Sequence, residues 1–169
     1  MLLLIVNVVL VLASMGQSAC PTNEQFVLAY GDVMNIQSDN YPDNYNGNTN
    51  CRWLISGPEG SRVVVKMLDF NTESCCDKLT LGNGVDRIDD SSLIVEAGGQ
   101  LPVNKAFSTT GAELWMDFTT DAETNHKGFN LEVIAYPAEG KKRFLHLNPH
   151  ILKGVLKLAP YSGGCRPKC

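Results

Sequence analysis

Short apolar runs alternate with turn-rich stretches along most of this 169-residue chain, a pattern typical of an all-β protein. The longest turn-rich stretch is 38–50, where Asp, Asn, Gly and Pro predominate. The pattern predicts strands at residues 26–30, 51–56, 61–70, 78–81, 93–97, 112–118 and 129–136. No long helical period occurs before residue 140, so an all-β sandwich is favoured over an α+β fold.

The first residues are typical of a targeting segment. Residues 1–13 form an apolar run that only Asn7 interrupts, and it is too short for the ~20 apolar residues of a membrane span. Small residues suited to cleavage follow, so residues 1–18 are predicted to be a signal peptide, with an uncleaved anchor as the alternative. We therefore expect a secreted, extracellular protein with no membrane span after signal removal.

The net charge of −4 hides a division between an acidic body and a basic tail. Residues 1–138 carry a net charge of −10, and residues 139–169 carry +6. An acidic body argues against nucleic acid as a partner and supplies carboxylates for hard cations. No nucleophile motif, metalloprotease motif or phosphate-binding loop occurs, so we expect no enzymatic activity.

Six cysteines are present: Cys20, Cys51, Cys75, Cys76, Cys165 and Cys169. Outside the cell, cysteines usually form disulfides, but six of them allow fifteen connectivities. Adjacent Cα atoms are ~3.8 Å apart, below the usual disulfide spacing, so a bond between Cys75 and Cys76 is not favoured.

Several short motifs then follow one another along the chain. They are Gly31, SDNYPDNY (38–45), CRWLI (51–55) with Pro58 and Gly60 after it, LDF (68–70) before an acidic segment ending at Asp77, Gly98 with Leu101 and Pro102, and Asp121 with Gly128 and Phe129. Together they resemble the CUB domain, an extracellular module, over residues 20–136. The resemblance implies a jelly-roll-like β-sandwich of two antiparallel sheets, which leaves residues 137–169 as a basic, cysteine-containing tail.

The resemblance also implies a calcium site. In many CUB domains three acidic residues bind Ca²⁺, and the matching positions here are Glu73, Asp77 and Asp121. Calcium prefers six to eight oxygen ligands, and a divalent ion relieves the repulsion between converging carboxylates. The family often has Ser two residues after the last Asp, where this chain has Glu123. The alternative is that these acids only solvate a loop.

For the cysteines, the resemblance implies a Cys20–Cys51 bridge. The family's second bridge cannot form, because Ala97 occupies the position of its second cysteine. The preferred interpretation pairs Cys75 and Cys76 with Cys165 and Cys169, which would staple the tail to the body. A Cys165–Cys169 loop and an intermolecular bridge are the alternatives.

The tail, 139–169, allows several interpretations. It is a basic extension with a short amphipathic helix near residues 151–157, a precursor cleaved after Lys141, Lys142 and Arg143, or a poorly ordered end. A zinc set made of His146, His150, Cys165 and Cys169 is a further alternative.

The leading functional prediction is a secreted binding module whose calcium-bound carboxylates engage Lys or Arg of an extracellular protein. The alternatives are a calcium-independent, glycan-binding adhesin like the CUB proteins of seminal fluid, and a precursor that releases a peptide after Arg143. His126, in the loop after Asp121, is expected to be exposed.

Overall fold

The protein is described here from a computed structural model, which describes residues 20–88 and 90–138. Within these residues the chain forms nine strands and one 3-10 turn. They are β1 (Glu24–Val27), β2 (Val33–Gln37), β3 (Asn50–Ser56), β4 (Ser61–Asn71), β5 (Lys78–Asn83), η1 (Asp90–Ser92), β6 (Leu93–Ala97), β7 (Ala106–Ser108), β8 (Glu113–Thr119) and β9 (Gly128–Pro137).

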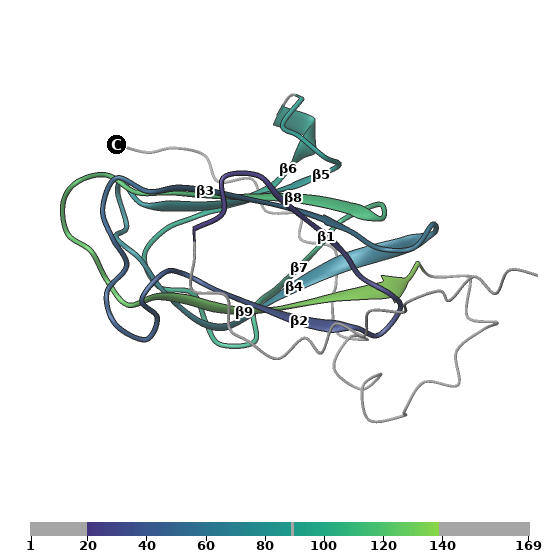
Figure 1. Ribbon diagram of the computed structural model, residues 1–169, viewed down its shortest axis with the longest axis horizontal. Coiled ribbons are helices and arrows are strands. Elements are labelled where there is room, and N and C mark those ends of the chain that lie inside the picture. Colours follow the sequence, from purple (N-terminus) through teal and green to yellow (C-terminus); the bar gives the residue numbers. More distant parts are fainter. Residues whose placement is uncertain (1–19, 89, 139–169) are drawn as a thin grey trace, which may run out of the picture.

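The strands form two sheets stacked face to face (Figure 1). The five-stranded sheet has the order β1-β3-β8-β5-β6, and the four-stranded sheet has the order β2-β9-β4-β7. All pairs are antiparallel except the edge pair of β1 and β3, which is parallel. The predicted all-β sandwich is therefore confirmed, with one parallel pair added to the two antiparallel sheets.

The strand predictions differ from the structure at three places. The strand expected at 26–30 begins two residues earlier and ends three residues earlier, at Glu24–Val27, where it pairs in register with β3. Strands β2 and β7 were not predicted, since VMNIQ has only three apolar residues and AFS is only three residues long. Both strands lie at the edges of the four-stranded sheet, where partner strands rather than local sequence define them.

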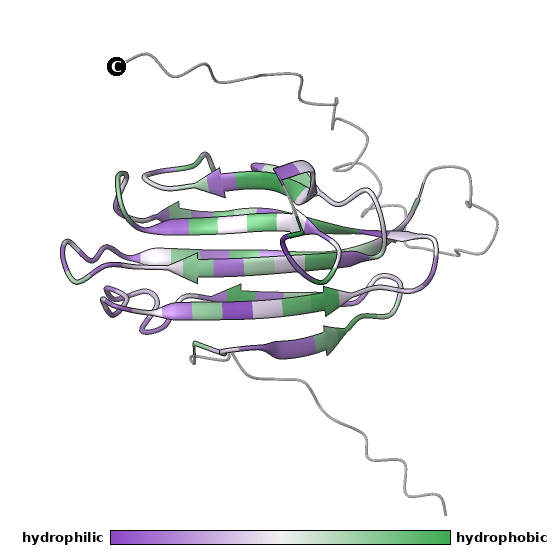
Figure 2. Ribbon diagram, turned by 90° about the horizontal axis from the view of Figure 1, so that it is seen from above, coloured by the Kyte–Doolittle hydropathy of each residue, from purple (hydrophilic) through white to green (hydrophobic). Residues whose placement is uncertain are grey.

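Aromatic side chains hold the two sheets together. Phe129 of β9 packs edge-on against Phe118 of β8, with ring centroids 5.0 Å apart, and against Trp53 of β3 at 6.3 Å. On its own sheet Phe129 stacks on Phe70, at 6.2 Å. Figure 2 shows the alternation of hydrophilic and hydrophobic positions along the strands that produces this inner layer.

A disulfide fixes the start of the described chain to the five-stranded sheet. Cys20 is bonded to Cys51 at the beginning of β3, with Cα atoms 4.9 Å apart, which is the pairing that the family resemblance implies. The Cys51 side of this disulfide is buried in the core. Among the described residues, no helix is long and apolar enough to cross a membrane. The expected signal peptide at 1–18 and nearly all of the expected tail, with the Lys141–Arg143 processing site, Cys165 and Cys169, lie outside these residues.

The position of Phe129 between the sheets predicts a large loss of stability on truncation. Phe129→Ala should lower the free energy of unfolding by about 3–5 kcal/mol, because a fully buried aromatic ring is replaced by a cavity. Urea denaturation measures the loss. Val27→Thr, at an 84% exposed position of β1, should change it by less than ~0.5 kcal/mol. Equal effects of the two substitutions would contradict this view of the core.

Candidate metal centre

Three loops meet at one end of the sandwich, at the left of Figure 1. They connect β2 to β3 (38–49), β4 to β5 (72–77) and β8 to β9 (120–127). The first and third are joined directly, because the backbone N–H of Asn48 donates to the carbonyl of Asp121 at 2.6 Å. The end of the sandwich is thus built from segments far apart in the sequence.

Asp77 lies at the centre of this end, with no solvent-exposed surface. One carboxylate oxygen, Oδ1, accepts a hydrogen bond from the backbone N–H of Asp121 at 2.9 Å. The other, Oδ2, accepts a short hydrogen bond from the hydroxyl of Tyr45. A buried carboxylate without such partners would be costly, so Asp77 holds the three loops in one arrangement.

Glu73, Asp77 and Asp121 come together as the resemblance implies. One carboxylate oxygen from each lies within 4.8 Å of the other two. Burial differs among them: Asp77 is buried, Glu73 is half-buried and Asp121 is exposed. The Oε2 atom of Glu73 is buried and accepts no hydrogen bond from any described residue. The cluster therefore has a closed inner side and an open outer side.

Tyr45 is a site residue that the sequence analysis missed. It is 1% exposed, and its hydroxyl both donates to Asp77 and accepts from the backbone N–H of Glu73 at 3.0 Å. Burial, followed by the hydrogen bond to Asp77, raises the pKa of Tyr45 to about 12. The phenol therefore remains a proton donor at every physiological pH. The available signal was the second Tyr of the SDNYPDNY motif at 38–45.

A second polar contact anchors the loop that carries Asp121. Lys127, at the end of this loop, forms a short ion pair with Asp69 of β4, and its ammonium lies 5.3 Å from the centroid of the Tyr41 ring. The hydroxyl of Tyr41 donates to the same carboxylate at 2.8 Å. The hydrogen bond from Lys127 lowers the pKa of Asp69 despite its partial burial. Since Tyr41 belongs to the β2–β3 loop, this contact ties two of the three loops to the same strand.

Two glycines allow the backbone to pass close to the cluster. A Cβ atom at Gly98 would lie 2.9 Å from the carbonyl oxygen of Asp77 and 3.0 Å from that of Glu73. A Cβ atom at Gly47 would lie 2.7 Å from the carbonyl oxygen of Asp121. Larger residues at these positions would push the acidic loops apart.

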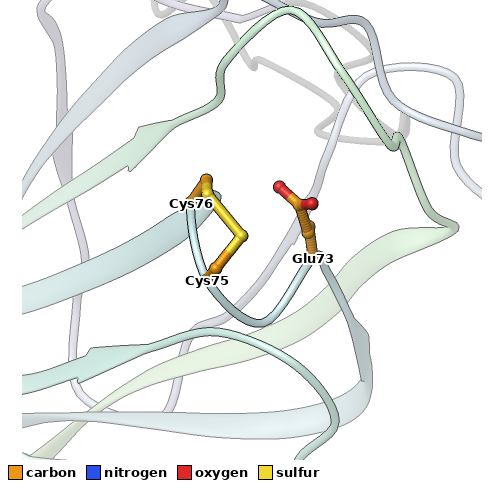
Figure 3. A group of neighbouring side chains, drawn as sticks. All are labelled: Glu73, Cys75 and Cys76. Atoms are coloured by element: carbon orange, nitrogen blue, oxygen red, sulfur yellow. A yellow bond between two sulfur atoms is a disulfide. The ribbon is translucent and has the colours of Figure 1, made fainter.

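The pairing of Cys75 and Cys76 corrects our interpretation of the cysteines. The structure bonds these neighbours to each other, with Cα atoms 3.8 Å apart, and not to the tail. Both lie on the exposed turn between Glu73 and Asp77, where their sulfur atoms are adjacent, whereas Cys51 is buried and already bonded to Cys20. The spacing argument against a vicinal bond was wrong. Figure 3 shows the carboxylate of Glu73 beside this disulfide.

Two other places in the described part of the chain do not form a comparable site. His126 is half-buried rather than exposed, and its carbonyl accepts from the backbone N–H of Tyr45 at 3.0 Å. An open depression of about 450 Å³ is bordered by Thr22, Asn50, Arg52 and Asp117. Its charges are already matched, because the Arg52 guanidinium donates to both oxygens of Asp117, at 2.8 and 3.1 Å.

The donor set fits a hard divalent cation. It consists of carboxylates, one of which has a buried oxygen with no partner among the described residues. Oxygen ligands of this kind are those that Ca²⁺ prefers, and a cation between them would offset their mutual repulsion. Glu73, Asp77 and Asp121 would hold the ion, which would supply a fixed positive charge at the rim.

The fold and this rim define a class of protein: a β-sandwich binding module with an acidic end. The CUB domain family matches residues 27–133, and the chain belongs to this family. CUB domains are extracellular modules that mediate protein interactions and are not themselves catalytic.

Several relatives and solved structures are similar to the chain. It is 34% identical to pig (Sus scrofa) cubilin over 63% of the chain and 3% of cubilin, and 30% identical to Xenopus laevis bone morphogenetic protein 1 over 82% of the chain and 17% of that protein. The chain thus spans only a small part of these relatives. The MASP-1 CUB2 domain bound to Ca²⁺ has a TM-score of 0.56 at 20% identity, over 68% of the chain and 99% of that domain. The extracellular region of zebrafish Gpr126/Adgrg6 has a TM-score of 0.58 at 22% identity, over 71% of the chain and 15% of that region.

The hydrogen bonds of Tyr45 predict a stability effect with a defined pH dependence. Tyr45→Phe should lower the free energy of unfolding by about 1–3 kcal/mol, because Asp77 and the N–H of Glu73 each lose a partner. The difference from wild type should be constant below pH ~10, where Tyr is protonated in both the folded and unfolded chain. It should shrink as the pH approaches about 12, because the folded-state pKa is raised and this stabilisation is lost as pH rises through it.

Urea unfolding across a pH series measures this difference. Tyr30→Phe is the matched control, since its hydroxyl reaches only the carbonyl of Glu59, at 3.1 Å on the surface. The control should lose less than ~0.5 kcal/mol. An alkaline stability profile that is parallel in wild type and Tyr45→Phe would contradict the role assigned to this hydroxyl.

Proposed function

We infer that this protein is a secreted binding module that uses a calcium-dependent carboxylate site to engage a basic side chain of an extracellular protein. The observation that carries the inference is the convergence of Glu73, Asp77 and Asp121 within 4.8 Å of one another. Carboxylates from two separate loops would repel each other at this distance without a cation between them.

The different burial of the three acids supports a different role for each of them. Asp77 is buried and bonded to Tyr45 and to the backbone of Asp121, so it orients the site from within. Asp121 is exposed, and Glu73 is half-buried. Asp121 therefore presents its carboxylate at the surface, where a partner can reach it, while the buried Oε2 of Glu73, which has no partner among the described residues, is available to the ion.

The bound ion supplies rigidity and keeps the acidic loops together. With one Ca²⁺ the three carboxylates retain a net charge of −1, which favours a cationic partner group. The ammonium of Lys or the guanidinium of Arg donates hydrogen bonds to carboxylate oxygens, and charge strengthens those bonds. Recognition of this kind is sensitive to ionic strength, because the contact lies at the rim.

Similarity to known proteins supports calcium as the ion. The MASP-1 CUB2 domain, whose fold this chain shares, is a calcium-bound CUB domain. At 20% identity this likeness concerns the fold, and the assignment of calcium ligands rests on the family resemblance together with the geometry of this chain. Extracellular calcium modules bind the ion with a Kd of about 10⁻⁴–10⁻³ M.

Calcium binding predicts a measurable stabilisation. At 5 mM Ca²⁺ and a Kd of ~10⁻⁴–10⁻³ M, the folded protein should gain about 1–2 kcal/mol relative to EDTA. Thermal denaturation should show a rise in Tm of a few °C, and isothermal titration should give one ion per chain. Asp121→Asn should weaken calcium binding by about tenfold or more, because one of three anionic ligands becomes neutral.

Glu123→Gln is the matched control, since it removes the same charge from the same exposed loop but lies outside the cluster. It should leave calcium binding unchanged. The partner contact is tested with an immobilised Lys-rich peptide, which should be bound in Ca²⁺ and released by EDTA. Unchanged Tm and peptide binding in EDTA would refute the calcium mechanism, and calcium-independent retention on a glycan array would favour the adhesin instead.

A further inference from the structure

The Cys75–Cys76 disulfide lies inside the acidic loop and has no part in the calcium site. Both cysteines are exposed, and they occupy two of the three positions between Glu73 and Asp77. The two sulfur atoms and a carboxylate oxygen of Glu73 all lie within 4.8 Å of one another. In Figure 3 the carboxylate faces the same side of the loop as the S–S bond.

We propose that a thiol reductant converts this disulfide into a binding site for a zinc-class dication, formed by the thiolates of Cys75 and Cys76 with the carboxylate of Glu73. Two thiolates and one carboxylate are a donor set that zinc accepts in its four-coordinate sites, with water in the remaining position. Thiolates prefer zinc to calcium, so the site differs in selectivity from the carboxylate cluster beside it.

The reaction balances in two steps. Two molecules of a thiol R–SH are oxidised to R–S–S–R, the Cys75–Cys76 bond breaks, and each cysteine sulfur receives one proton. Zinc then replaces the two thiol protons, which pass to solvent as two Zn–S bonds form. Exposure of both cysteines gives the reductant access, whereas Cys51 of the other disulfide is buried.

The flanks of the loop keep the donors together after reduction. The backbone N–H of Thr72 donates to the carbonyl of Gly99 at 2.9 Å, and the ammonium of Lys78 donates to the carbonyl of Ser74 at 2.6 Å. Asp77 is held by Tyr45 and Asp121. None of these contacts involves a cysteine side chain, so breaking the S–S bond leaves Glu73 beside the two thiols.

Glu73 belongs to both groups of donors. Zinc bound to the two thiolates adds no net charge to the loop, but it takes a carboxylate oxygen of Glu73 away from the calcium position. Calcium binding should therefore weaken when zinc is bound. The calcium affinity of the loop would then depend on the redox state of its surroundings. This coupling rests on the proposed calcium function, but the zinc site itself does not.

The experiment uses the full chain with Cys165→Ser and Cys169→Ser, so that tail thiols cannot contribute. The protein is reduced with limiting dithiothreitol, which is then removed under anaerobic conditions. Alkylation and mass spectrometry verify that Cys75 and Cys76 alone are reduced. Zinc is titrated against a chromophoric chelator, and Co²⁺ serves as a spectroscopic substitute that gives a thiolate-to-metal charge-transfer band.

We expect one zinc per reduced chain, and loss of that zinc from the oxidised chain. Cys75→Ser/Cys76→Ser should bind no zinc while keeping a cooperative thermal unfolding transition in the absence of metal, which shows that the variant folds. Glu73→Gln should weaken zinc by about tenfold or more. A reduced chain that binds no zinc, or a serine variant that binds it equally well, would overturn the proposal.

Calcium titrations separate this proposal from the proposed function. Zinc-loaded, reduced protein should bind calcium about tenfold more weakly than oxidised protein, because one of the three carboxylates is withdrawn. Unchanged calcium affinity with zinc bound would overturn the shared role of Glu73. Absence of calcium binding in every form would overturn only the calcium function. The thiolate site is tested separately, by the number of zinc ions bound per reduced chain.

Discussion

The buried carboxylate of Asp77 is the constraint on which this end of the molecule depends. Without exposed surface, it must be satisfied by protein donors, and its two oxygens are bonded to two other loops through Tyr45 and the backbone N–H of Asp121. Each bond fixes the position of a segment distant in the sequence. Loss of either donor would leave a desolvated charge, which is more costly than the loss of an ordinary surface contact.

The sandwich supplies the rigid base for this arrangement. Phe129 packs between the sheets at the start of β9, and the loop just before it carries Asp121 and Lys127. Lys127 pairs with Asp69 on β4, the strand that leads into the acidic loop. The same two strands therefore position both the core and the site. Changes in core packing should consequently shift the loops that carry the acidic residues. The buried carboxylate of Asp77 supports the rim from inside, and the exposed carboxylate of Asp121 provides a surface for contact with a partner.

Sequence patterns predicted the architecture well where the physics is local. Short apolar runs between turn-rich stretches identified the central strands, since each of these strands has one face in the core. The edge strands β2 and β7 have weaker patterns and depend on their neighbours. The three acids were identified through a family resemblance, and the structure brings them together. Their convergence is a tertiary property, which neither composition nor spacing encodes.

Two features of the site were beyond the sequence argument for physical reasons. Tyr45 stands 28 residues before the Glu73 N–H that it accepts from, and nothing in its motif distinguishes a site hydroxyl from a core ring. For Cys75 and Cys76, average disulfide spacing argued against a neighbour pairing, whereas the exposed turn places their sulfur atoms side by side. Average geometry is a weak guide at a turn whose shape is set by the contacts on either side of it.

The most direct test of the carboxylate site is a crystal structure determined at saturating calcium, with anomalous data collected to identify the ion. We predict one Ca²⁺ peak among Glu73, Asp77 and Asp121, with carboxylate oxygens at about 2.3–2.6 Å from it. Only water between the three carboxylates, under conditions that saturate the protein with calcium, would contradict this explanation of the acidic rim.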